Sequence, residues 1–149
     1  MILIIGYGNP LRGDDGIGWH AAQSLGAENQ EANVEVIACH QLVPELAESL
    51  SRAKTAVFID ASATAAPGAV QCQAVPPATL LPGSMTHHVT PGALLTMAEV
   101  LFGSRPRAFA ITVGCASFDC GTQLSPEVAA TLPVIKVGVR EIVAGQSAI

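Results

Sequence analysis

The chain has 149 residues, which is the size of one domain with a core of its own, and we expect a single domain over residues 1–149. Half of the residues are hydrophobic and only 13% are charged, a composition that excludes a disordered chain. The net charge of −5 argues against a nucleic-acid partner, because such a partner needs a basic face to displace its counterions.

The chain also carries no signal for a membrane or for secretion. No apolar stretch reaches the roughly 18 residues that a spanning helix needs, and the N-terminus lacks the basic segment of a signal peptide. We therefore expect a cytoplasmic protein. Its cysteines lack the paired spacing of a zinc site, so we interpret them as free thiols or small hydrophobic residues: Cys39, Cys72, Cys115 and Cys120.

The first half of the chain alternates strand and helix patterns. Residues 2–6 form a continuous apolar run, typical of a buried strand, and a helix with an apolar face is predicted from residue 16 to about residue 25. Asp14 or Asp15 is placed to cap that helix. Residues 34–37 alternate as a half-exposed strand, and residues 43–50 repeat the helical spacing.

The second half continues the alternation. Residues 56–60 are predicted to form a central strand, and residues 69–75 an edge strand. A helix is expected from Thr90-Pro91 to Gly103, since a capping hydroxyl followed by proline favours a helix start. Residues 108–113 form another buried strand, and a last helix runs from residue 125 to about residue 143 with a kink at Pro133.

This order predicts a three-layer α/β/α fold with a mostly parallel, twisted sheet of about five strands and helices on both faces. One long irregular stretch, residues 76–84, interrupts the alternation.

Three polar signals follow strands, where open α/β proteins bind ligands. Asp15 comes after the glycine turn that ends the first strand, Asp60 ends the central strand, and His87-His88 closes the long loop. Two carboxylates and an imidazole on one edge would make an open oxygen and nitrogen site for a divalent cation.

Each signal has an ordinary structural explanation as well. An aspartate at a helix start often caps it, Asp60 can bond its own turn backbone, and the two loop histidines can be solvent-exposed. His20 and His40 show no partner pattern, so we expect them at the surface or in local hydrogen bonds. The turn is also a poor dinucleotide fingerprint, because Leu11 stands where the third glycine would be.

Three segments resemble one known family. The run from Gly6-Tyr7-Gly8-Asn9-Pro10-Leu11 to Asp14-Asp15-Gly16-Ile17-Gly18 looks like the N-terminal signature of the nickel–iron hydrogenase maturation endopeptidases. Val57-Phe58-Ile59-Asp60-Ala61 and the segment from His87 to Leu101 are similar to its second acidic strand end and to its histidine loop and helix.

The resemblance implies a protease that removes a C-terminal extension from the hydrogenase large-subunit precursor, with substrate-borne nickel as its recognition signal and no organic cofactor. Its metal-contacting and catalytic residues correspond to Asp15, Asp60 and His87, with His88 as the alternative histidine. Metal-assisted hydrolysis would follow, with one carboxylate taking the proton of a water. Nothing in the sequence demands more than a monomer.

The chain departs from the family at two places. Many members have glutamate at the position of Asp15, and many carry Asp-Gly-Gly-Thr where this chain has Ala38-Cys39-His40-Gln41. We expect the substrate cleft to be lined by Gly8, Asn9, Gln41 and Glu45.

Two other functions fit part of the pattern. A non-cleaving, nickel-dependent checkpoint or chaperone for the large subunit would use the same three ligands. The segment Gly6-Tyr7-Gly8-Asn9-Pro10 also resembles the start of bacterial peptidyl-tRNA hydrolase, but the later Thr-Arg-His-Asn signature of that esterase is missing.

Overall fold

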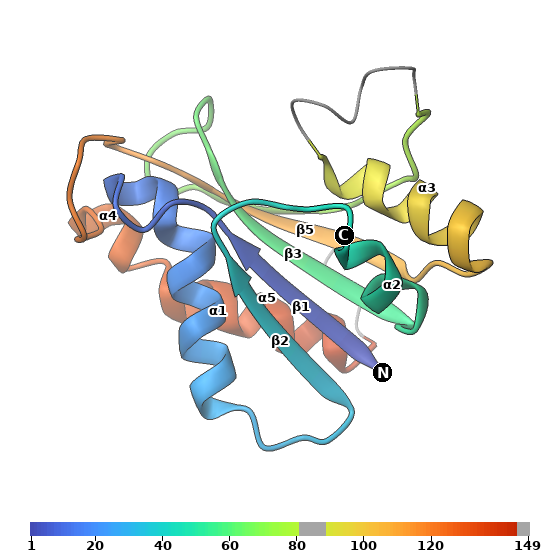
Figure 1. Cartoon of the computed structure of the whole chain (residues 1–149). Coiled ribbons are helices and arrows are strands. Elements are labelled where there is room, and N and C mark those ends of the chain that lie inside the picture. The colour runs from blue at the N-terminus through green and yellow to red at the C-terminus, as the bar shows by residue number, and fades with distance from the viewer. Residues whose placement is uncertain (81–88, 146–149) are drawn as a thin grey trace.

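A five-stranded sheet forms the centre of the computed structural model, which describes residues 1–80 and 89–145 (Figure 1). The strands lie in the order β2-β1-β3-β5-β4, and all are parallel except β4, which runs antiparallel to β5. Their bounds are β1 Ile2–Tyr7, β2 Val34–Cys39, β3 Thr55–Ser62, β4 Val70–Ala74 and β5 Arg107–Gly114. The predicted mostly parallel sheet is confirmed.

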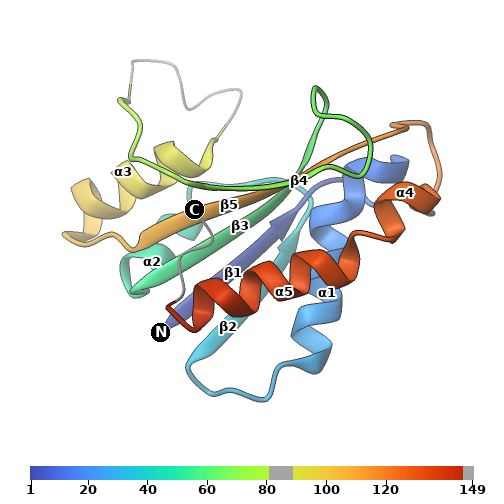
Figure 2. The ribbon, with the colours of Figure 1, turned by 180° about the vertical axis from the view of Figure 1, so that it is seen from behind.

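Helices cover both faces of this sheet. Figures 1 and 2 show α2 and α3 on one side and α1 and α5 on the other, which confirms the three-layer fold. The helices are α1 Ile17–Glu28, α2 Leu46–Ser51, α3 Pro91–Phe102, α4 Pro126–Ala129 and α5 Leu132–Val143, and a 3₁₀ turn, η1 Gly13–Gly16, precedes α1. In the described ranges, no helix combines the length and the apolar character needed to cross a bilayer.

The strand pleat divides the core into two clusters. Leu3 and Phe58 point toward α2 and α3, whereas Ile4 and Val57, their neighbours along the chain, point toward α1 and α5. All four side chains are buried, so the central strands β1 and β3 are apolar on both faces. This is why they appear in the sequence as continuous apolar runs.

The ends of α3 agree with the prediction from the sequence, whereas the last predicted helix differs from it. Thr90 caps α3, its Oγ1 accepting a hydrogen bond from Ala93 N at 3.1 Å, and Gly103 ends the helix at a φ of 80°. The expected kink at Pro133 is wrong. The chain instead forms two helices, α4 and α5, and Pro133 lies in the first turn of α5, where its missing N–H has no intrahelical partner to lose.

Candidate active site at the carboxyl edge of the sheet

The carboxyl ends of the parallel strands bring several polar side chains to one edge. In the pairing of β1 with β3, Gly6 lies opposite Ile59, and one residue further along each strand are Tyr7 and Asp60. Asp15 reaches the same edge from η1, because that turn follows β1 directly. The structure thus places Asp15 and Asp60 at the same edge of the sheet, and the charge of Asp15 contributes to the raised pKa of Asp60.

The glycines of the first motif allow this close approach. Gly8 has a φ of 144°, and a Cβ atom built on it would lie 2.0 Å from the carbonyl oxygen of Asp15. Only a residue without a side chain fits there. The turn can therefore fold back so that the backbone N–H of Asn9 donates to Asp15 Oδ2 at 2.9 Å. The two predicted cleft residues Gly8 and Asn9 are in direct contact with Asp15.

Asp60 is the most perturbed carboxylate of this edge. Burial raises its pKa to about 6, and the negative charge of Asp15 adds to that effect. Two hydrogen bonds act in the opposite direction. The N–H of Ala61 donates to Asp60 Oδ1 at 2.7 Å, and the Tyr7 hydroxyl is the second donor. The expected hydrogen bond between Asp60 and its own turn backbone is thus present. With a pKa of about 6, the Asp60 carboxyl group can also gain or lose a proton near neutral pH.

Tyr7 is a functional candidate that sequence reasoning missed. Burial raises the pKa of its phenol, and the neighbouring charge of Asp60 raises it further, so the hydroxyl stays protonated and donates to the carboxylate. The sequence feature that points to Tyr7 is its position as the last residue of β1, directly before Gly8.

The thiols of this edge are not activated nucleophiles. Burial and the nearby carboxylates raise the pKa of the Cys115 thiol to about 11, and burial also raises the pKa of Cys39. Both therefore stay protonated at neutral pH, whereas a cysteine nucleophile needs the thiolate. All four cysteines are free, as expected, and Cys120 is exposed.

The aspartate doublet has a different structural role from the predicted cap. Neither Asp14 nor Asp15 caps α1, whose N-cap residue is Gly16 without a side-chain hydrogen bond. Asp14 is completely buried and instead accepts hydrogen bonds from a loop more than 100 residues away in sequence. Burial alone would raise its pKa, but these hydrogen bonds outweigh burial and lower it, so Asp14 is a carboxylate at neutral pH.

The other predicted residues lie in different places. His87 and His88 lie outside the described residues, and within the ranges that are described no three His, Cys, Asp or Glu side chains group as a metal site. Gln41 and Glu45 are exposed, and Glu45 lines a pocket with Leu101 and Phe102 at the ends of α2 and α3.

The two remaining histidines differ from each other. His40 is exposed, as predicted. His20 is only partly exposed, beside Trp19, and burial lowers its pKa. Its Nε2 atom is buried and has no hydrogen-bond partner among the described residues.

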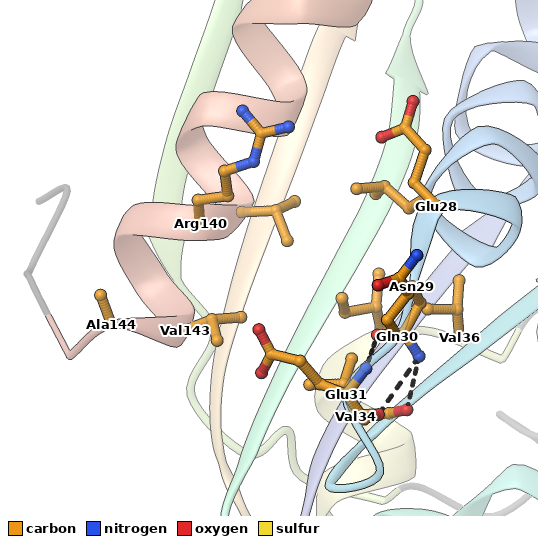
Figure 3. A pocket seen from close by; sticks show the side chains of 12 residues that line it. Glu28, Asn29, Gln30, Glu31, Val34, Val36, Arg140, Val143 and Ala144 are labelled. Carbon is orange, nitrogen blue, oxygen red and sulfur yellow. Dashed lines mark hydrogen bonds between the residues drawn. The ribbon is translucent and has the colours of Figure 1, made fainter.

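A pocket of about 700 Å³ lies at the opposite end of the sheet, between the C-terminal turns of α1 and α5 (Figure 3). Two of the polar side chains that line it, Asn29 and Glu28, already have partners. The Asn29 amide donates to Val34 O and accepts from Glu31 N, and Glu28 pairs with Lys136 at 2.6 Å. This pocket therefore collects no reactive set comparable with the carboxyl edge.

Several solved structures with the same fold are named as hydrogenase maturation proteases. The chain is similar to the hydrogenase maturating endopeptidase HybD from E. coli, with 22% identity, a TM-score of 0.74, and 97% of this chain and 93% of that chain covered. It is also similar to the [NiFe] hydrogenase maturation protease HycI from Thermococcus kodakarensis, with 22% identity, a TM-score of 0.76, and 95% and 90% covered. No model of a protein family matches the chain, and no curated protein matches it.

A third solved structure shows the same likeness. The hydrogenase 2 maturation peptidase from Thaumarchaeota archaeon SCGC_AB-539-E09 aligns with a TM-score of 0.71 and 22% identity, over 98% of this chain and 99% of that one. Similarity at this level of identity establishes the shared fold over nearly the full length.

Proposed function

We propose that this protein is an endopeptidase that removes a C-terminal extension from the nickel-loaded large subunit of a nickel–iron hydrogenase. One observation carries the proposal. Asp15 and Asp60 both lie at the carboxyl edge of a sheet whose fold is that of hydrogenase maturation proteases. In this proposal the protein acts as a cytoplasmic monomer without an organic cofactor.

The substrate-borne nickel would be contacted by Asp15, Asp60 and the histidine at position 87 or 88. Carboxylate oxygens and an imidazole nitrogen are suitable ligands for such an ion. Bound there, the nickel supplies a Lewis acid that polarises the scissile carbonyl group and acidifies a water molecule.

The residues of the chain prepare this chemistry. The N–H of Asn9 holds Asp15 from one side, and the Tyr7 hydroxyl orients Asp60. Either Asp15 or Asp60 accepts the proton of the attacking water, and the pKa of Asp60, about 6, suits both uptake and release of a proton near neutral pH. The protonated thiols of Cys39 and Cys115 agree with hydrolysis by water.

The test is a cleavage assay with purified components. Nickel-loaded precursor is incubated with the protein and weighed by mass spectrometry, and nickel-free precursor is the control. We expect loss of a short C-terminal peptide from the loaded form alone, and no cleavage by Asp60→Asn. Normal cleavage by that variant would refute the assigned site.

The same assay tests the checkpoint function, and a second assay with a peptidyl-tRNA substrate tests the esterase function. Intact precursor in a stable, nickel-dependent complex would indicate a checkpoint or chaperone that does not cut. Hydrolysis of a peptidyl-tRNA ester would place the protein among the esterases, although the net charge of −5 disfavours an RNA substrate.

A further inference from the structure

The strongest unused feature of the structure is the buried carboxylate of Asp14. Only two polar residues in the described ranges are classed as buried, Asp14 and Thr131, and Asp14 is the one that carries a charge. A buried charge is retained only where hydrogen bonds compensate for its lost hydration. Its partners therefore show what the carboxylate holds together.

Asp14 receives four hydrogen bonds from the loop that follows β5. Its Oδ2 accepts from Ala116 N at 2.9 Å, from Ser117 N at 3.1 Å and from Ser125 Oγ at 2.7 Å. Its Oδ1 accepts from Ser125 N at 2.7 Å. Both carboxylate oxygens are thus used, and a single side chain ties η1 to both ends of the loop 115–125.

Backbone hydrogen bonds join the same two segments at Leu11, Gly13 and Asp14. Gly13 N donates to Gly121 O at 2.9 Å, and Gly121 N donates to Leu11 O at 2.9 Å. Asp14 N donates to Ser117 O at 3.0 Å. The turn that carries Asp15 is therefore fixed to the loop by side chain and main chain together.

The loop is in turn fixed to the strand that carries Asp60. Cys115 N donates to Ser62 O at 3.2 Å, and Ser62 ends β3 two residues after Asp60. A continuous series of hydrogen bonds thus runs from η1 through Asp14 and Cys115 to the end of β3. The carboxylate of Asp15 itself accepts a hydrogen bond from Asn9 N.

We propose that Asp14 is a positioning residue, which holds the turn of Asp15 at a fixed distance from Asp60 through the loop 115–125. The proposal rests on the proposed function of Asp15 and Asp60. Asp14 makes no contact with substrate. It acts through Asp15, because the two residues are adjacent and any movement of one backbone is passed to the other. Displacement of a reacting group by about 1 Å can lower a rate about a hundredfold.

The test compares three variants. Asp14→Asn keeps the size of the side chain but replaces one acceptor oxygen by an NH₂ group, which must face an N–H donor of the loop. Ser125→Ala removes one hydrogen bond to Oδ2 and leaves the three backbone donors in place. Val139→Ala, in the buried face of α5, is the control for a general loss of stability.

Two readouts are measured on each variant at a temperature where it is fully folded. The first is the amide proton resonance of Asn9 in NMR spectra, which reports the hydrogen bond from Asn9 N to Asp15 Oδ2. The second is the rate of precursor cleavage at saturating precursor.

We expect the Asn9 resonance to move upfield in Asp14→Asn and, to a smaller extent, in Ser125→Ala, while Val139→Ala leaves it unchanged. Cleavage by Asp14→Asn should fall by up to about a hundredfold in kcat with KM nearly constant. An unmoved Asn9 resonance in both Asp14→Asn and Ser125→Ala would overturn the proposal, even if the protein is a protease. A moved resonance in a protein that cleaves nothing would support the positioning and refute the proposed function instead.

Should Asp14→Asn fail to fold, Ser125→Ala decides alone. An Asn9 resonance and a kcat that both equal those of the unaltered protein would then overturn the proposal.

Discussion

Two glycines of α1 offer a matched test of how closely this helix lies on the sheet. A Cβ atom on Gly18 would lie 2.2 Å from the carbonyl oxygen of Ile59 and 2.5 Å from that of Tyr7. Ordinary contacts of a Cβ atom begin near 3.4 Å, so Gly18→Ala is short of space by about 1.2 Å. Both obstacles are backbone atoms, and no side-chain rotation can relieve the clash. Gly26→Ala meets only Val36, at 3.7 Å.

The two substitutions should therefore change stability in opposite directions. Overpacking costs about 1–3 kcal/mol and occasionally more, whereas alanine in a helix gains up to about 1 kcal/mol over glycine. For Gly18→Ala we expect a net loss of about 2 kcal/mol or more, which for a chain of this length lowers Tm by about 4–8 °C. Gly26→Ala has no clash and should raise Tm by up to about 4 °C.

Thermal unfolding followed by circular dichroism measures both values under one condition. Both variants replace glycine by alanine in the same helix, so the gain from helix propensity is the same in both and drops out of the difference in Tm. Equal Tm values for the two variants would refute the close approach of α1 to β1 and β3. Because Gly18 lies three residues after Asp15, cleavage by Gly18→Ala should also fall, whereas Gly26→Ala should cleave normally.

Four further results are expected. The raised pKa of Asp60 means that its ionisation destabilises the fold as pH rises toward 6, so Asp60→Asn should gain up to about 3 kcal/mol in urea unfolding at pH 7 while cleavage is lost. Tyr7→Phe removes a hydrogen bond that favours the Asp60 carboxylate, so the acidic midpoint of the cleavage rate against pH should move upward. The lowered pKa of Asp14 contributes stability that is present above the unfolded pKa, about 3.9, and is lost as pH falls through the folded value. As pH is lowered below about 4, the urea midpoint should therefore fall, and this fall should be smaller in Asp14→Asn. Lys136→Met breaks the ion pair with Glu28, whose side chain is exposed, so thermal unfolding should show almost no change in Tm; a clear fall in Tm would mean that this pair joins α1 to α5 more strongly than the exposure of Glu28 indicates.

Local pattern alone determined the order of elements and the edge at which the site lies. The apolar runs of β1 and β3 are visible because both faces of these strands are buried, and the start of α3 is visible because Thr90 and Pro91 act within one turn. Asp15 and Asp60 could be placed at one edge because parallel strands bring their carboxyl ends together.

The tertiary structure decided what the polar groups of that edge do. Asp14 and Asp15 are indistinguishable as neighbours in sequence, yet Asp14 is buried against a loop 101–111 residues away, whereas the carboxylate of Asp15 accepts a hydrogen bond from Asn9 N in the turn after β1. The hydrogen bond between Tyr7 and Asp60 likewise joins two strands that pair only after folding. Hydrogen bonds between distant segments produce no periodic pattern in the sequence. An aspartate that makes such a bond looks, in the sequence, the same as one that caps a helix or closes a turn.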